Sequence, residues 1–180
     1  MMSKVYTRTG DRGDTNVMGI PEKVSKASPR IEALGDVDEL NSMIGMALAQ
    51  QSDPHVIDAL RSIQNELFTV GAELGTAPEA TVAIPRVTAD HIASLERTME
   101  AMDPGEVKEF VMPRGSAAVA SLHLARAMAR RAERRCVALA EFEVVNPELL
   151  RYMNRLSSLL YTLAVWLQRH EGRSQEHPTY

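Results

Sequence analysis

The fold is decided by an amphipathic stretch that reads Ser121-Leu-His-Leu-Ala-Arg-Ala-Met-Ala-Arg-Arg-Ala-Glu-Arg-Arg135. Alanine, leucine and arginine are strong helix formers, because their side chains lose little rotamer freedom in a helix. Small apolar residues recur at three- and four-residue steps on one face, which is typical of a helix packed against others. These residues are Val119, Leu122, Ala125, Ala129, Ala132 and Cys136. The pattern predicts a long helix that begins after the N-cap Ser116 and ends near Ala140.

The other face of this helix carries a charged stripe. The stripe consists of His123, Arg126, Arg130, Glu133 and Arg134. Like charges four residues apart repel, so stacked arginines cost stability unless an anion lies against them. Because a planar guanidinium matches phosphate oxygens, the stripe is a candidate polyphosphate clamp. A solvated charged face, partly paired with Glu133, explains the same pattern.

Similar apolar periods predict four more helices and almost no strand. These helices cover about 30–48, 54–74, 88–102 and 146–170. Five helices joined by short connections indicate an all-α, up-and-down bundle. We expect one domain over residues 1–180, with a loop at 1–29, the bundle at 30–170 and a polar, loosely held tail at 171–180.

Composition excludes several classes of protein. The chain has 180 residues, is 44% hydrophobic and carries a net charge of −4, which opposes a general nucleic-acid binder. Its one cysteine, Cys136, excludes an internal disulfide and a cysteine-rich zinc site. The apolar runs are too short for a bilayer and the N-terminus lacks a signal-peptide core, so we expect a cytoplasmic protein with no membrane partner. The five histidines lack metal-ligand spacing, and no metal site is predicted.

Residues 1–29 lack a helical period and contain Thr7-Arg-Thr-Gly-Asp-Arg-Gly-Asp-Thr15. Glycines let backbone N–H groups approach a ligand closely, and Arg8, Arg12 and Lys26 would add positive charge. Asp11 and Asp14 could help to hold a magnesium ion. An ordinary surface loop has the same composition, and the segment lacks the Gly-Lys-Ser/Thr ending of a Walker-type phosphate loop.

Two polar residues stand out on the helices. Asp38 lies on the side of its helix that also carries Leu34 and Asn41, where an acid needs a partner. An arginine of the charged stripe is a candidate partner, although acids early in a helix also simply favour its dipole. Asn154 lies mid-helix, where asparagine is mildly unfavourable, so it contacts a ligand or faces solvent.

Several segments resemble those of the PduO-type ATP:cob(I)alamin adenosyltransferases, both in their residues and in their order along the chain. The matching segments are 6–13, 24–26, 35–42, 63–68, 71–74, 110–113, 123–126, 130–135 and 154–157. They follow family order over roughly residues 5–165. The resemblance implies a five-helix bundle that assembles as a homotrimer with active sites between subunits. It also implies ATP with Mg²⁺, and reduced cobalamin, as substrates.

The resemblance further implies roles for individual residues. ATP would be held by Thr7, Arg8, Thr9, Gly10, Asp11, Arg12, Gly13, Asp14, Thr15, Asn16 and Lys26 of the loop, and by Arg130, Arg131, Ala132, Glu133, Arg134 and Asn154 of the helices. Arg126 would pair with Asp38 of a neighbouring subunit, and these two residues would serve catalysis together with Arg130. Phe110 would form an apolar wall under the corrin ring. The adenosyl group of ATP would move to cobalt, and triphosphate would leave.

Two positions depart from the family pattern. Arg114 stands where a small residue is usual, close to the expected corrin pocket, and Ser158 stands where an acid is usual. A carrier or sensor that binds ATP or cobalamin without turnover would share every binding residue. An RNA-binding helical protein is disfavoured by the acidic balance and the lack of aromatic platforms. The chemistry implies a flavin-type reductase and a cobalamin-dependent acceptor enzyme as further partners.

Overall fold

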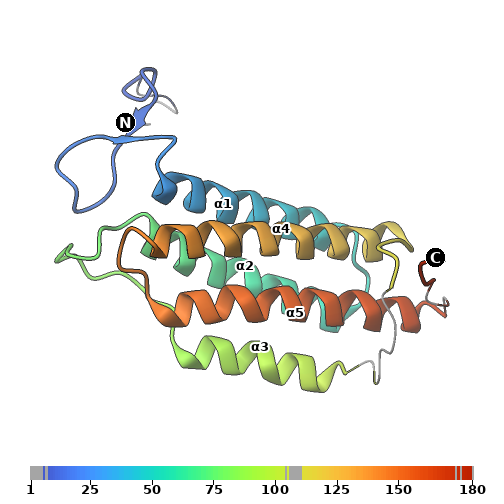
Figure 1. Ribbon diagram of the computed structural model, residues 1–180. Helices are drawn as coiled ribbons and strands as arrows, with labels where there is room; N and C mark the ends of the chain where they lie inside the picture. Colours follow the sequence, from blue (N-terminus) through green and yellow to red (C-terminus); the bar gives the residue numbers. More distant parts are fainter. Residues whose placement is uncertain are drawn as a thin grey trace, which may run out of the picture.

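In its described part, the chain folds into five helices that alternate in direction (Figure 1). The computed structural model describes residues 6, 8–103, 105, 111–172, 174 and 176–179. The helices are α1 (Pro29–Leu48), α2 (Pro54–Leu74), α3 (Ala89–Ala101), α4 (Ala117–Ala140) and α5 (Pro147–His170). The predicted order and approximate bounds of the helices are confirmed.

Local side chains set where the helices begin. The Ser116 hydroxyl accepts a hydrogen bond from the backbone N–H of Val119 at 3.2 Å, which caps α4. Asn146 caps α5 in the same way, and Pro147 follows at the first helical position. A proline there costs little, because the N–H that it lacks has no partner inside the helix. Both predicted caps are therefore confirmed.

The helices pack as a bundle in which α1 contacts α2 and α4, and α5 contacts α4, α3 and, less extensively, α2. The predicted apolar face of α4 is fully buried, and its small residues allow α1 and α5 to approach closely. Apolar faces of the other helices complete one core. No helix in the described ranges is both long enough and apolar enough to cross a bilayer.

The segment before α1 is a loop with one short hairpin. Strand β1 (Asp14–Thr15) pairs with β2 (Val24–Ser25) in an antiparallel ladder. The sequence did not predict these strands, because two residues are too few to show an alternating pattern. The loop is fastened to the end of α2, where the Met18 N–H donates to the Gly75 carbonyl at 3.1 Å and the Ala77 N–H donates to the Met18 carbonyl at 2.8 Å.

The C-terminal tail is held against the segment that precedes α4. The Met112 N–H donates to the Glu176 carbonyl at 2.8 Å, and the Glu176 carboxylate lies 3.2 Å from the Arg114 guanidinium. Gln168 donates to the Ser174 carbonyl at 3.1 Å. The prediction of a loosely held tail is therefore wrong for residues 174 and 176. The unusual Arg114 has its charge balanced by the chain's own tail.

Candidate functional site

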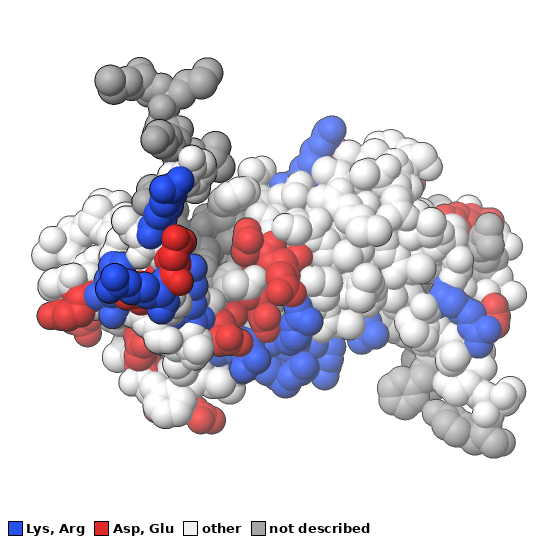
Figure 2. All heavy atoms as spheres, turned by 90° about the horizontal axis from the view of Figure 1, so that it is seen from above, with Lys and Arg blue, Asp and Glu red and all other residues white. Residues whose placement is uncertain are grey.

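Two arginines of α4 bind the acidic side of α1. Arg131 lies 3.4 Å from an Asp36 carboxylate oxygen and also donates to Glu39. Arg135 lies 3.1 Å from Glu32 and 3.7 Å from Asp36. Figure 2 shows the result, with basic side chains gathered beside a band of acidic ones on the face seen from above. The charges of Arg131 and Arg135 are therefore balanced within the chain, and both residues hold α4 against α1.

Two other arginines of α4 keep their charge available. Arg130 and Arg134 are exposed, and neither forms an ion pair with another described residue. Between them, Glu133 accepts a hydrogen bond from the Asn154 side chain at 2.7 Å, which joins α4 to α5. Arg130 and Arg134 of the predicted stripe can thus meet an external anion, whereas Arg131 and Arg135 beside the stripe hold α1.

Asp38 and Arg126 do not pair within one chain. Asp38 is exposed in the single chain, although Asn41 on the same side of the helix is buried and Leu34 is half-buried. It lines a groove of about 580 Å³ between α1 and α2, whose walls include Leu67 and Phe68. Phe68 is 73% exposed. Arg126 is half-buried on α4, and its Nε atom has no hydrogen-bond partner among the described residues.

His123 lies inside the bundle and not on an accessible stripe. Its side chain is only 3% exposed and packs edge-on against Tyr161, with ring centroids 6.3 Å apart. Burial lowers the pKa of His123, and the positive charge of Arg126 lowers it further. The ring is therefore uncharged near neutral pH, and its expected place on the binding stripe is wrong.

Two lysines shape the glycine-containing loop. Lys23 donates to the Thr9 carbonyl at 2.6 Å and lies 3.1 Å from the Asp14 carboxylate. Lys26 donates to the Gly10 carbonyl at 3.0 Å. Sequence reasoning missed Lys23, whose partners come together only when the chain turns back on itself. The Asp14 carboxylate is paired with Lys23, and the described residues contain no cluster of three metal-ligating side chains.

Glycine is required at two positions of this loop for different physical reasons. A Cβ at Gly10 would lie 3.1 Å from the Lys26 ammonium, so a larger residue would displace that lysine. Gly13 has φ +84°, a conformation that side chains disfavour. The loop residues Arg8, Asp11, Arg12 and Asn16 are exposed. Thr7 and Phe110, expected to contact ATP and the corrin ring, lie outside the described residues.

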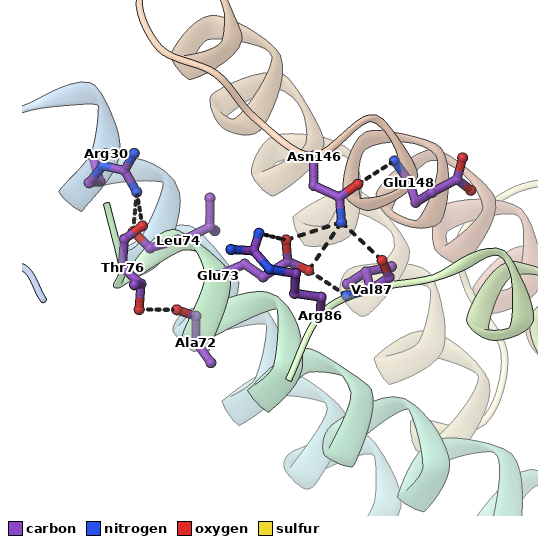
Figure 3. A network of polar contacts seen from close by, with 9 residues as sticks. All are labelled: Arg30, Ala72, Glu73, Leu74, Thr76, Arg86, Val87, Asn146 and Glu148. Carbon is purple, nitrogen blue, oxygen red and sulfur yellow. Dashed lines mark hydrogen bonds and ion pairs between the residues drawn. The ribbon is translucent and has the colours of Figure 1, made fainter. Parts of the chain in front are cut away.

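Arg30 lies just after the loop and binds the end of α2, as Figure 3 shows. One terminal nitrogen donates to the carbonyl oxygens of Leu74 and Thr76 at 2.7 and 3.0 Å, and Nε donates to Glu143 at 3.0 Å. The guanidinium therefore satisfies carbonyl groups at the end of α2, where positive charge is favourable. An arginine in the first turn of α1 opposes that helix's own dipole, and this misplacement was a signal in the sequence that Arg30 has a specific partner.

Glu73 forms the second half of this network (Figure 3). Its buried carboxylate accepts hydrogen bonds from the Asn146 side chain at 3.1 Å and from the Val87 N–H, and it lies 3.6 Å from Arg86. A cavity of about 450 Å³ opens beside it. The network joins α2, α5 and the segment before α3. Met18 of the loop binds the nearby Gly75, so the network also stabilises the position of the loop.

These features define a helical-bundle protein that can hold a polyphosphate with a glycine-containing loop and with exposed, unpaired arginines. Residues 5–167 match the family model for cobalamin adenosyltransferase. The chain belongs to the cobalamin adenosyltransferase family, and the predicted family and enzyme class are confirmed.

Known relatives agree with this assignment. The chain is 41% identical over 175 residues to a corrinoid adenosyltransferase of Bacillus subtilis, covering 94% of this chain and 89% of the relative. It is 40% identical to the corrinoid adenosyltransferase PduO of Salmonella typhimurium, covering 89% of this chain and 48% of that longer protein. A solved structure of a variant PduO-type ATP:corrinoid adenosyltransferase from Lactobacillus reuteri, complexed with cobalamin and ATP, matches with a TM-score of 0.91. Its identity is 30%, and the match covers 98% of this chain and 100% of that chain.

Proposed function

We propose that this chain transfers the 5′-deoxyadenosyl group of ATP to the cobalt of cob(I)alamin, giving adenosylcobalamin and triphosphate. The observation that carries the proposal is the exposed pair Arg130 and Arg134. Both lack ion-pair partners among the described residues, although Arg131 and Arg135 of the same helix are paired. Placed against a triphosphate, these two guanidinium groups gain the anionic partner that the chain does not supply. The Lactobacillus reuteri enzyme is complexed with both substrates, which supports the same pair of ligands here.

The reaction needs charge stabilisation more than proton transfer. The Co(I) electron pair attacks the 5′ carbon of ATP, the bond from that carbon to the triphosphate oxygen breaks, and the oxygen keeps the electron pair. Negative charge grows on the leaving triphosphate, and preorganised cations and N–H donors stabilise it. No side-chain nucleophile or base is required. His123 and Cys136 are not placed to serve as base or nucleophile. The His123 ring is buried and uncharged, and the Cys136 thiol is buried and protonated.

The proposed ATP site combines the loop with α4 and α5. Its members are Thr7, Arg8, Thr9, Gly10, Asp11, Arg12, Gly13, Asp14, Thr15, Asn16, Lys26, Arg130, Arg131, Ala132, Glu133, Arg134 and Asn154. Arg131 and Ala132 contribute mainly by position, since Arg131 is bound to acids of α1 and Ala132 is buried. Mg²⁺ enters with ATP and is held chiefly by phosphate oxygens. Phe110, which lies outside the described residues, is the proposed contact with the corrin ring.

The site is completed by a neighbouring subunit of a homotrimer. Asp38 on the apolar α1/α2 groove takes Arg126 of the next chain as its partner. This pairing is supported by the exposed carboxylate beside an exposed Phe68, and by the unsatisfied Nε atom of Arg126. Charge complementarity at such a contact fixes the relative position of two subunits. Asp38 and Arg126 therefore organise the site that Arg130 serves.

The reaction requires an electron donor and an enzyme that uses the product, and we propose one partner for each role. A flavin-type reductase supplies the electron that makes cob(I)alamin, and a cobalamin-dependent enzyme takes the product. A reducing compartment such as the cytoplasm suits both cob(I)alamin and the free thiol of Cys136.

The deciding experiment mixes the purified chain with MgATP and chemically reduced cobalamin without oxygen. We expect the cobalamin absorbance to change to that of adenosylcobalamin, with one triphosphate released per adenosyl group transferred. A chain that binds MgATP and cobalamin but forms no adenosylcobalamin would be a carrier, and the proposed reaction would be wrong.

A further inference from the structure

Lys23 joins the two ends of the loop from Thr9 to Asp14. Its ammonium group donates to the Thr9 carbonyl at 2.6 Å and lies 3.1 Å from Oδ1 of Asp14. An ammonium group has three donors, so it can hold both acceptors at once. Lys26 donates to the next carbonyl, that of Gly10, at 3.0 Å. Two successive carbonyl groups of the loop are therefore turned toward lysines.

The direction of these carbonyls sets the direction of two N–H groups. In a trans peptide unit the C=O and N–H bonds point to opposite sides. The Thr9 carbonyl faces Lys23, so the N–H of Gly10 points away from that lysine, and the Asp11 N–H points away from Lys26 for the same reason. Neither N–H donates to another residue in the described part of the chain. Successive free N–H groups of this kind form anion-binding concavities.

We propose that Lys23 is a positioning residue of the nucleotide site, which orients the N–H groups of Gly10 and Asp11 toward the triphosphate and neutralises Asp14. The inference rests on the proposed function, because the loop must bind ATP. An unpaired Asp14 carboxylate would repel the same phosphates. Lys23 acts through the loop and does not touch the reacting atoms, so it controls MgATP affinity more than the rate of transfer.

Substitution of Lys23 separates affinity from rate. In Lys23→Met the side chain keeps its bulk and loses its charge, and we expect the Kd and KM for MgATP to rise about tenfold, the size of one lost charge-assisted hydrogen bond. The kcat at saturating MgATP and the KM for cobalamin should stay near wild type. Lys23→Arg should recover most of the affinity. Glu22→Gln is the matched control, because it removes one charge from an exposed residue next to Lys23 in the same loop.

A double-mutant cycle shows whether Lys23 acts through the loop. Isothermal titration would measure MgATP binding, without reduced cobalamin, by the wild type, Lys23→Met, Asp14→Ala and the combined variant. We expect Lys23→Met to cost less affinity when Asp14 is already absent, because one of its two contacts has gone. Tripolyphosphate, which has no adenosine, should lose affinity in Lys23→Met by the same factor as MgATP.

Each other result has a definite meaning. Equal MgATP affinity in Lys23→Met and wild type would overturn the inference, and so would a fall in kcat with unchanged KM. A full effect of Lys23→Met in the Asp14→Ala background would mean direct contact with phosphate, which also contradicts a positioning role. Failure of the wild-type chain itself to bind MgATP would instead contradict the proposed function.

Discussion

Arg130 and Arg131 are neighbours in the chain with different surroundings. Arg131 is bound to acids of α1, whereas Arg130 is exposed and has no ion-pair partner among the described residues. We predict that Arg130→Ala lowers the kcat for adenosyl transfer by about 10²–10³, the usual effect of losing one donor to a charged leaving group. The helical circular dichroism should not change, because the side chain supports no packing.

The matched control for this prediction is Arg151→Ala on α5. Arg151 is also exposed, and among the described residues its one ion-pair partner is Glu148, one turn away. Turnover of the control should stay near wild type when cobalamin absorbance is followed under the same conditions. Equal turnover by Arg130→Ala and Arg151→Ala would show that Arg130 does not hold the triphosphate.

Cys136 is the one thiol of the chain and is fully buried on α4. Burial, together with the nearby carboxylates of Asp36 and Glu133, raises its pKa to about 12. Since the thiolate is the reactive form, we predict that iodoacetamide does not modify the native protein at pH 8 within the time that fully modifies it in urea. Mass spectrometry would measure the modified fraction. Rapid modification without urea would contradict the burial of Cys136.

Glu73 joins three elements at one end of the bundle. Its carboxylate accepts hydrogen bonds from Val87 and Asn146. In Glu73→Ala the buried Val87 N–H would lose its acceptor, and the Asn146 side chain would keep only the Val87 carbonyl. We predict a loss of about 2–4 kcal/mol in the free energy of unfolding, measured by urea titration, because unsatisfied buried polar groups are costly. The exposed Glu79 provides the control, since Glu79→Ala should change stability by less than about 0.5 kcal/mol. Equal urea midpoints would show that the network is not needed for stability.

The sequence predicted the helices well because their signals are local. The apolar period of α4 and the caps Ser116 and Asn146 each depend on residues within a few positions. It did not predict the Glu73 network, because that depends on contacts between distant segments. Helical spacing also placed His123 on the charged stripe. Spacing gives the direction of a side chain around α4, but it does not show that Tyr161 covers this side chain.

The candidate site was predicted less completely than the helices. Residue types and spacing indicated the loop and the α4 arginines, and family resemblance assigned them to ATP. The division between Arg130 and Arg131 depends on which side of α4 meets α1. Lys23 carries no signal of its own, because exposed lysines are common in loops and its partners lie at the far ends of a turn. Two residues of the Glu73 network did carry a signal in the sequence. Arg30 in the first turn of α1 and Glu73 in the last turn of α2 each oppose the dipole of their helix.

At the scale of the whole molecule, subunit assembly is the main prediction. Asp38→Arg would place a positive charge opposite the neighbour's Arg126, and like charges at an interface cost several kcal/mol. We predict that this variant sediments as smaller species than wild type and loses most of its activity. The reversed pair, Asp38→Arg with Arg126→Asp, should restore the trimer in part. A variant Asp38→Arg that sediments as wild type would contradict the proposed subunit contact.

The link between Met18 and the end of α2 has a consequence for the order in which the protein acquires its parts. The Met18 backbone bonds to Gly75 and Ala77, which the ribosome adds after the loop. The nucleotide loop therefore lacks its hydrogen-bonding partners until α1 and α2 have been synthesised and have packed against each other. A nascent chain halted before residue 75 should leave this loop open to proteases, and competence to hold a nucleotide should be a late event in the life of each new molecule.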